Sequence, residues 1–358
     1  MSDDDTLAAS WADSSSDPNI TNDCFDVNFT PSHFAHKPLW QIRLECITVI
    51  TVTLITIFGN ITNILILRSL PSWGTYTGNF LINLAITDLG VGVFLMSFAI
   101  YPASVNSGYW PYGTFMCRFS GYLGAVFCST SITSLTLISI DRYIAVTQAL
   151  RYYTLMTDSR CYTLIVSSWI VSIICYLPLF MDDIVGVKYY PNSFLCAANF
   201  GEHLYYIIAV IMIFMLPCSA IMTFTYSQLL LLSFRHSKQI QTQERATTKG
   251  GQIRKNRKAI KTLLIITGCY NIAWLPFTSL SFYRAFHHND EDACKEETLP
   301  HWVEFFLPWL AMSNSFSNSI VYFAFNKEYR GQARKLFRLG RTHNNNTVID
   351  LIEMEGHL

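Results

Sequence analysis

The chain has 358 residues, of which 51% are hydrophobic and 14% are charged, and its mean hydropathy is +0.27. Because soluble proteins contain about 25% charged residues, this composition argues against a soluble domain and favours a membrane protein. Acidic and basic residues number 25 each, and a net charge of zero argues against a nucleic-acid partner.

The segment before the first apolar stretch, residues 1–43, contains no basic-then-apolar signal peptide. We therefore expect the first span to act as an uncleaved signal-anchor. Sequons at Asn19 and Asn28 predict glycosylation of this segment if it is extracellular. A third match, at Asn60, lies inside the first span and is discounted.

Seven apolar stretches are long enough to cross a bilayer, because a spanning helix needs roughly 20 residues. Their approximate limits are 44–68, 76–102, 114–147, 161–181, 204–234, 253–284 and 302–324. Several contain proline, which membrane helices tolerate because neighbouring helices satisfy the freed backbone groups. The sequence thus predicts an all-α membrane protein, a seven-transmembrane helix bundle spanning residues 44–324.

The distribution of charge predicts how this bundle lies in the membrane. Basic residues gather between the fifth and sixth stretches and after the seventh, whereas acidic residues occupy 3–5, 182–183 and 290–297. Because basic loops stay in the cytoplasm, residues 1–43 are expected outside and the tail 339–358 inside. We expect a multi-pass protein of the plasma membrane.

Four of the ten cysteines fall in regions expected outside, where an oxidising environment favours disulfides: Cys24, Cys117, Cys196 and Cys294. The other six lie in or near spans and are expected to be core residues. The sequence has no Cys/His cluster of a metal site, and no phosphate loop or nucleophile elbow of an enzyme.

Asp88 lies in the middle of the second span, where an acidic side chain costs roughly 2.5–3.5 kcal/mol and therefore needs partners. Polar candidates on other spans are Asn60, Ser131, Asn314, Ser315 and Asn318. Two interpretations are open at this point. The residues form either a hydrogen-bonded structural network or a pocket for a small cation such as sodium.

The third span ends in Asp141-Arg142, after a run from Phe119 to Ile140 that contains no formal charge. A charge pair at the edge of lipid is expensive and usually serves function. We expect it to act as a switch that faces the cytoplasm. Past the seventh span, aromatic and apolar residues alternate with basic ones over 325–338, which predicts an amphipathic helix bound to membrane lipid.

Taken in order, these motifs resemble those of rhodopsin-like (class A) G-protein-coupled receptors, and the resemblance covers all seven spans. The pattern looks most like an orphan receptor near the amine-receptor branch. The matching motifs are Gly59-Asn60, Leu84-Ala85-x-x-Asp88, Trp110-x-x-Gly113 with Cys117, Asp141-Arg142-Tyr143, Trp169, Pro217, Trp274-Leu275-Pro276, Asn314-Ser315 and Asn318 to Tyr322.

The resemblance implies a receptor, not an enzyme, that passes an extracellular signal to a heterotrimeric G protein. It implies a Cys117–Cys196 disulfide, and Cys24 and Cys294 are left as a candidate second pair. It also implies a sodium pocket of Asp88, Ser131, Asn314, Ser315 and Asn318 with Trp274 as its lid. Beyond a possible sodium ion, no cofactor is expected. Arg142 and Leu150 would contact the G protein, and the activation switch would comprise Asp141, Arg142, Tyr143, Tyr226, Trp274, Pro276, Asn318 and Tyr322.

The sequence departs from the family pattern in several places. Ser319 stands where the seventh-helix motif usually has proline, and Tyr226 lies nine residues after Pro217 instead of eight. From Arg245 through His288 there is no acid. Many receptors have an acid at the inner end of the sixth helix that pairs with the third-helix arginine, and Asn256 occupies about that position here. We therefore expect weak restraint of the inactive state and signalling without ligand.

The ligand pocket is expected to be apolar and to exclude classical biogenic amines. Gly124 stands where amine receptors place an aspartate, no acid lies between Cys117 and Ile140, and no lysine for a retinal lies in 302–325. The expected lining is Gly124, Ala125, Cys128, Phe277, Ser281, Glu304 and Pro308. An apolar ligand or the second outer loop would fit such a site.

Two alternative functions remain open from the sequence. The acidic stretch at 290–297 would steer a basic peptide, which makes a peptide receptor of the same family the first alternative. A membrane transporter is the second, but it predicts inverted repeats and broken, Gly-rich half-helices, and the seven stretches have neither.

Overall fold

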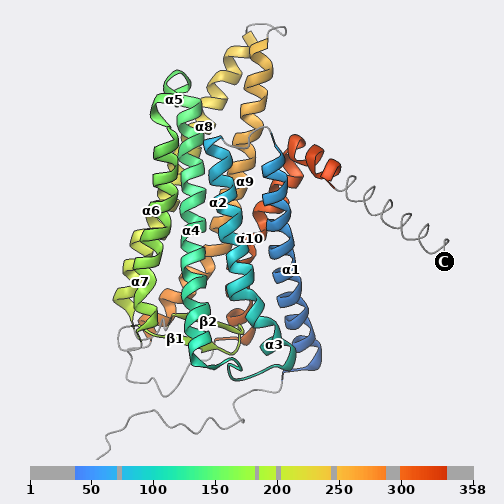
Figure 1. The fold of residues 1–358 in the computed structure, drawn as a ribbon, viewed down its shortest axis with the longest axis vertical. Coiled ribbons are helices and arrows are strands. Elements are labelled where there is room, and N and C mark those ends of the chain that lie inside the picture. Colours follow the sequence, from blue (N-terminus) through green and yellow to red (C-terminus); the bar gives the residue numbers. More distant parts are fainter. Residues whose placement is uncertain are drawn as a thin grey trace, which may run out of the picture.

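The computed structural model describes residues 37–70, 75–181, 185–198, 203–242, 248–287 and 299–336. Its long helices run side by side along one axis (Figure 1). Several expectations fall outside the described residues: the sequons at Asn19 and Asn28, the cysteines Cys24 and Cys294, the acidic stretch 290–297 and the tail from 337 onward.

The helices follow the apolar stretches closely. They are α1 (Leu39–Ser69), α2 (Tyr76–Val91) with η2 (Gly92–Met96) and α3 (Ser97–Val105), α4 (Gly113–Thr147), α6 (Asp158–Tyr176) with η4 (Leu177–Phe180), α7 (Leu204–Val210) with η5 (Ile211–Met215) and α8 (Leu216–Thr242), α9 (Thr248–His287) and α10 (His301–Phe325). Between α4 and α6 lie two short turns, η3 (Ala149–Arg151) and α5 (Tyr152–Leu155). Most helices run a few residues past the apolar stretch, because the polar ends continue the backbone hydrogen bonding into the interface.

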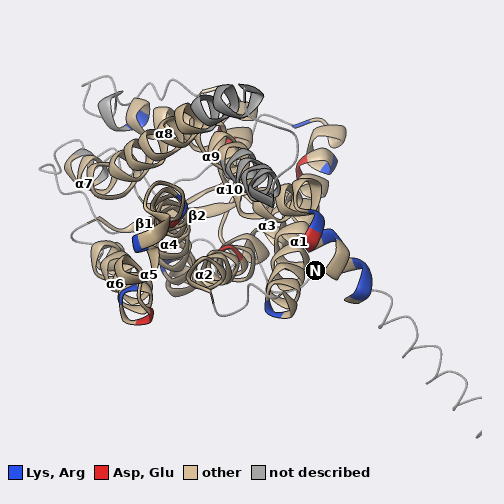
Figure 2. Cartoon of the chain, turned by 90° about the horizontal axis from the view of Figure 1, so that it is seen from above, with Lys and Arg blue, Asp and Glu red and all other residues tan. Residues whose placement is uncertain are grey.

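Among the described residues, five helical segments are long and apolar enough to cross a membrane: Leu39–Ser69, Tyr76–Val105, Gly113–Thr147, Asp158–Phe180 and Ile208–Leu232. The helices α9 and α10 pack against each other in the same bundle. Figure 2 looks along the bundle and shows that most of the described ribbon is tan, which means residues that are neither acidic nor basic. Exposed apolar side chains such as Ile170 and Ile174 on α6 therefore face the region that lipid fills.

The helix α4 forms the centre of the bundle, where it packs against α2, α6 and α8. Its buried positions are rich in small residues, including Ser120, Gly121, Gly124, Ser131 and Ser134. Small residues let helix backbones approach closely in a membrane, where burial of apolar surface alone gives little drive to associate.

A two-stranded antiparallel hairpin, β1 (Val187–Tyr190) and β2 (Leu195–Ala198), covers one end of the bundle (Figure 1). A disulfide joins Cys117 at the start of α4 to Cys196 in β2. Phe194, in the turn between the strands, has a φ of 59° and is buried. We call this the hairpin end, and the opposite end, which carries Asp141 and Arg142, the Arg142 end.

A short helix over residues 327–336 follows α10. The Asn326 side chain caps it by accepting a hydrogen bond from the Tyr329 amide at 3.1 Å. Tyr329 and Ala333 are buried against the bundle, with Leu336 packed beside them. This helix has the apolar face expected of the segment 325–338, whose last two residues lie outside the described part.

Candidate functional site

The Asp88 carboxylate is fully buried between α2, α4 and α10. One oxygen accepts a hydrogen bond from Ser131 Oγ at 2.8 Å, and the other accepts one from Asn318 Nδ2 at 2.8 Å. Ser315 is a third hydrogen-bonding partner. The structure thus brings together four of the five residues expected around a cation.

Two side-chain oxygens of the expected set are unpaired. Asn318 Oδ1 and Asn314 Oδ1, one turn apart on α10, are buried without a hydrogen-bond partner among the described residues. Asn60 belongs to a neighbouring network, because its amide donates to the backbone oxygens of Thr56 and Ser315 instead of to Asp88. The cluster is therefore rich in oxygen atoms and lacks donors for some of them.

Trp274 on α9 lies between two parts of the core. It packs against the cluster that surrounds Tyr322 and against the cluster that contains Phe194. Its ring stacks on Tyr270 and meets Phe277 edge-on, at centroid distances of 6.0 and 5.9 Å. Trp274 also lines the cavity described below. A change in its position would therefore alter the packing of both core clusters.

At the Arg142 end, the Asp141 carboxylate is held by three elements. It accepts hydrogen bonds from Thr77 Oγ1 at 2.5 Å and Tyr152 OH at 2.6 Å, and it pairs with Arg142 at 3.3 Å. Asp141 is fully buried, whereas the Arg142 side chain is 30% exposed. These contacts anchor α5 to α2 and α4 and leave the guanidinium at the surface.

Two tyrosines lie close enough to Arg142 to interact with it electrostatically, Tyr226 on α8 and Tyr322 on α10. Both are buried, and the Tyr322 hydroxyl has no partner among the described residues. The unusual spacing after Pro217 therefore does not turn Tyr226 away from Arg142. Leu150 is fully exposed. The side chain of Asn256 lies outside the described ones.

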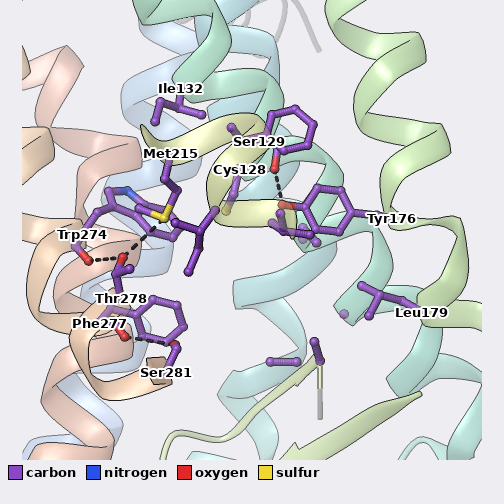
Figure 3. Close-up of a pocket in the computed structure, with 18 of the residues that line it drawn as sticks. Cys128, Ser129, Ile132, Tyr176, Leu179, Met215, Trp274, Phe277, Thr278 and Ser281 are labelled. Atoms are coloured by element: carbon purple, nitrogen blue, oxygen red, sulfur yellow. Dashed lines mark hydrogen bonds between the residues drawn. The ribbon is translucent and has the colours of Figure 1, made fainter. Parts of the chain in front are cut away.

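A cavity of about 160 Å³ lies between α4, α9 and η5, beneath the hairpin. Figure 3 shows part of its lining. Five of the seven expected residues line it: Gly124, Ala125, Cys128, Phe277 and Ser281. Residues that sequence reasoning missed include Ser129, Tyr176, Met215, Trp274, Thr278 and Met312. Among the described residues, no charged side chain lines this cavity.

Glu304 and Pro308 do not line the cavity, which corrects the expectation for both. Glu304 accepts hydrogen bonds from Arg284 at 2.7 Å and from Asn192, and Pro308 is buried within α10. The hairpin turn covers this part of α10, because Trp309 Nε1 donates to the Ser193 carbonyl at 2.9 Å. The cavity begins one turn deeper, at Met312.

The hairpin forms the wall of the cavity and does not fill it. Cys196, Ala197 and Ala198 of β2 line the space, whereas Phe194 packs against Phe305 outside it. The loop insertion considered from the sequence is therefore not seen for the described residues of that loop, 185–198. Room remains beneath the hairpin for another molecule.

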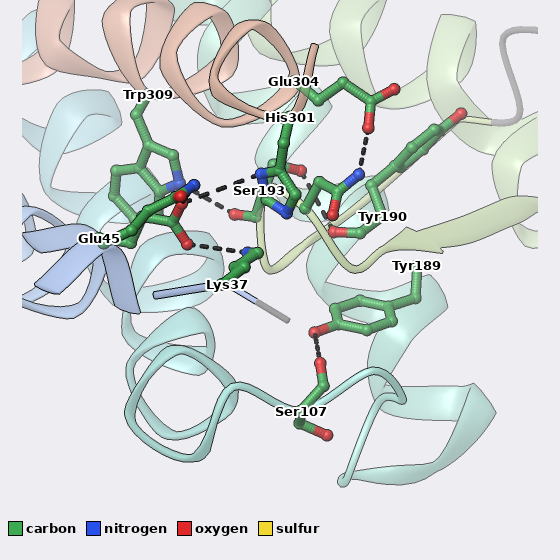
Figure 4. A network of polar contacts seen from close by, with 11 residues as sticks. Lys37, Glu45, Ser107, Tyr189, Tyr190, Ser193, His301, Glu304 and Trp309 are labelled. Carbon is green, nitrogen blue, oxygen red and sulfur yellow. Dashed lines mark hydrogen bonds and ion pairs between the residues drawn. The ribbon is translucent and has the colours of Figure 1, made fainter. Parts of the chain in front are cut away.

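A cluster of polar side chains fastens the hairpin to the helices (Figure 4). Glu45 of α1 accepts from Lys37 Nζ and Gln41 Nε2, both at 2.9 Å, and lies 3.9 Å from His301 Nδ1. The Lys37 ammonium lies 5.2 Å above the Phe194 ring. Burial lowers the pKa of Lys37, although its pairing with Glu45 acts in the opposite direction.

These features define a class of protein. Seven packed helices, a hairpin tethered by a disulfide, a cavity beneath it and a charge pair at the far end are the architecture of a seven-transmembrane receptor. Residues 59–322 match the family model described as 7 transmembrane receptor (rhodopsin family), and the chain belongs to that family. The family consists of receptors, not enzymes, and it sets the transporter alternative aside.

Individual relatives agree with this assignment. The chain is 32% identical to the histamine H2 receptor of Rattus norvegicus over 291 residues, which are 80% of this chain and 77% of that one. It is 29% identical to the probable G-protein coupled receptor 21 of Mus musculus, with coverage of 78% and 79%. It is 27% identical to the G-protein coupled receptor 52 of Bos taurus, with coverage of 86% and 84%.

Among solved structures, squid rhodopsin matches with a TM-score of 0.72 and 18% identity, covering 86% of this chain and 88% of that one. This likeness concerns the fold alone, and it confirms the expected seven-helix bundle. The protein is a G-protein-coupled receptor and, as the family implies, a multi-pass protein of the plasma membrane. Its relatives include receptors named for an amine and receptors named only by number, as expected of an orphan near the amine branch.

Proposed function

We propose that this receptor takes a ligand other than a classical biogenic amine from the extracellular side and passes the signal to a heterotrimeric G protein through the Arg142 end. In this orientation the hairpin end faces outward and the tail lies in the cytoplasm. One observation carries the proposal. Asp141 is fixed by Thr77 and Tyr152, while Arg142 stays partly exposed beside Tyr226 and Tyr322.

The exclusion of amines rests on the charge of the cavity. Several relatives are named histamine H2 receptors, but Gly124 lines the cavity here and no lining residue in the described part of the chain is acidic. An ammonium group buried without a counterion carries a large desolvation penalty. We therefore do not propose histamine as a ligand of this receptor.

A sodium ion is proposed as an allosteric ligand at Asp88. Small hard cations prefer oxygen ligands, and the unpaired Oδ1 atoms of Asn314 and Asn318 fit that preference. Ser131 and Ser315 supply hydroxyl oxygens. When bound, the ion would offset the charge of Asp88, while the residues around it hold α2, α4 and α10 together.

The test is a panel that measures dissociation of each class of G protein in cells, with the unchanged receptor and with Arg142→Ala. We expect measurable dissociation for at least one class and its loss in the variant. Arg43→Ala is the matched control, because it removes an exposed arginine from the hairpin end of α1. The proposal fails if the receptor and Arg142→Ala give the same signals at equal surface expression.

A receptor for a basic peptide is the remaining alternative. Its acidic stretch, residues 290–297, lies outside the described residues, so the alternative keeps only its support from the sequence. A basic peptide would need this stretch, whereas a small ligand in the cavity would not. Replacing the five glutamates and aspartates of 290–297 with their amides separates the two, because only binding of a basic peptide should be lost.

A further inference from the structure

We propose that the cavity beneath the hairpin binds a small neutral aromatic ligand with one hydrogen-bond acceptor, such as an aryl ketone. This inference rests on the proposed function, because it names the ligand class for the same receptor. Three observations support it: the size of the cavity, the absence of charge among its described lining residues, and the hydrogen bonds that its polar groups already make.

The size of the cavity limits the ligand to a small molecule. Its volume is about 160 Å³, and an apolar protein cavity of about 150 Å³ is known to hold benzene. A ligand of roughly six to ten non-hydrogen atoms therefore fits. The hairpin, which the Cys117–Cys196 disulfide tethers to α4, lines one side of this space.

The lining excludes charged ligands. It consists of apolar, aromatic and hydroxyl side chains, with the sulfur atoms of Cys128, Met215 and Met312 among them. The acids Asp88 and Glu304 are already engaged, since Asp88 is bound by Ser131 and Asn318 and Glu304 is bound by Arg284. A cation in the cavity would have no partner for its charge.

Most hydroxyl groups of the lining are already satisfied. Thr278 donates to the Trp274 carbonyl at 2.8 Å, and Ser281 donates to the Phe277 carbonyl at 3.0 Å. These bonds are drawn in Figure 3 and leave both hydroxyl hydrogens occupied. A ligand with several polar groups would lose hydrogen bonds to water and find few replacements here.

Two donors in the described lining remain for the ligand. One is the Trp274 Nε1–H, which is buried without a partner among the described residues. Ser129 Oγ and Tyr176 OH lie 2.6 Å apart across α4 and α6, and a single hydrogen bond joins them. Two hydroxyl groups carry two hydrogens, so the pair keeps one hydrogen that can be donated to a third group. A carbonyl oxygen has two lone pairs, so a ligand with a single carbonyl acceptor can accept from this hydrogen or from Trp274 Nε1.

The experiment compares three probes of nearly the same shape. Acetophenone has the acceptor, α-methylstyrene replaces the carbonyl oxygen with a CH₂ group, and 1-phenylethylamine carries a positive charge. The purified full-length receptor is treated with a small thiol reagent, methyl methanethiosulfonate, and labelling is followed by mass spectrometry at Cys128 inside the cavity. Cys269, a free cysteine that does not line the cavity, is the internal control.

We expect acetophenone at ten times its dissociation constant to slow labelling of Cys128 about tenfold, because roughly one site in ten is then empty. At equal concentration, α-methylstyrene should protect less and 1-phenylethylamine should not protect. Cys269 should react equally throughout. Equal protection by the amine and the ketone, or no protection by either aromatic probe, would overturn the proposal.

Two variants test the details. Tyr176→Phe should reduce the advantage of acetophenone over α-methylstyrene, because the Trp274 Nε1 donor is left, while both probes still protect Cys128. Ala125→Phe fills part of the cavity and should abolish protection by both. If the reagent does not reach Cys128, the same probes are compared by melting temperature. The ketone must then raise the melting temperature of the unchanged receptor and not that of Ala125→Phe.

The outcome is independent of G-protein coupling, because the assay contains only the receptor. Loss of protection with an intact Arg142-dependent signal would refute the ligand class alone. Protection together with an unchanged signal in Arg142→Ala would refute the proposed coupling alone.

Discussion

At the scale of single residues, Ser319 shows how a departure from the family pattern is used. Its hydroxyl accepts a hydrogen bond from Asn63 Nδ2 at 2.7 Å, and Asn63 in turn accepts one from the Tyr329 hydroxyl. A Cβ at Gly59 would come within 3.1 Å of the same Ser319 oxygen. Where relatives have a proline, this chain has a hydrogen-bonded connection between α1, α10 and the helix at 327–336.

Ser319→Ala should lower the stability of the receptor by about 1–3 kcal/mol, because the Asn63 amide loses its short partner. Only a longer contact to Asn60, at 3.4 Å, would remain. Ser317→Ala is the matched control, since that hydroxyl bonds only to the Asn314 carbonyl of its own helix. Equal melting temperatures for the two variants would contradict this role.

Asp88 leads to a second prediction at this scale. If sodium binds beside it, replacing choline chloride with sodium chloride at equal ionic strength should raise the melting temperature, because a ligand that binds only the folded state stabilises it. Asp88→Asn should remove this difference, since the amide keeps hydrogen bonding but loses the charge. A sodium effect of the same size in the variant would rule out the site.

At the scale of elements, the hairpin is positioned by side chains from several helices. Lys37 and Glu45 form a buried ion pair beside Phe194, Trp309 of α10 donates to the hairpin turn, and Tyr189 donates to the Ser107 carbonyl at 3.1 Å. Because β2 is a wall of the cavity, these contacts set the shape of the ligand site from outside it.

Removing one charge of this ion pair should destabilise the receptor more than removing both charges. Lys37→Met or Glu45→Leu alone leaves a buried charge and should cost about 3–5 kcal/mol, whereas the double variant should recover part of this loss. The measurement is a double-mutant cycle on melting temperature. Additive losses would show that the two charges do not depend on each other, contrary to their distance of 2.9 Å.

At the scale of the whole molecule, the Arg142 end raises the question of restraint. Arg142 pairs with its neighbour Asp141, and from Arg245 through His288 the sequence offers no acid to hold it from α9. Without an ion pair between α9 and Arg142, the closed state is not stabilised relative to the open state. The receptor should therefore populate the open state without ligand.

Asn256→Glu should therefore reduce signalling in the absence of ligand. The new carboxylate would meet Arg142 only when the helices are closed, and a coupling of about 1.4 kcal/mol would shift the equilibrium roughly tenfold. Asn256→Gln is the matched control of size without charge. The readout is basal G-protein dissociation at equal surface expression, and equal values for the two variants would refute the idea.

The sequence by itself determined the class of the protein. The length and apolarity of each stretch are local properties, so the helix limits could be predicted to within a few residues at most ends. The cost of burying Asp88 in lipid also predicted that Ser131, Ser315 and Asn318 gather around it, which the structure shows. Such a charge has few ways to be satisfied.

Only the tertiary structure decided which side chains share the cavity. That depends on how each helix is rotated about its axis and on the path of the hairpin, and neither follows from a single stretch of sequence. The hairpin turn covers α10 at Trp309, which removed Glu304 and Pro308 from the lining and left Met312 in it. The pairing of Ser129 with Tyr176 and of Glu45 with Lys37 likewise arose from packing between elements, because hydrogen bonds across helices leave no periodic signal in the sequence.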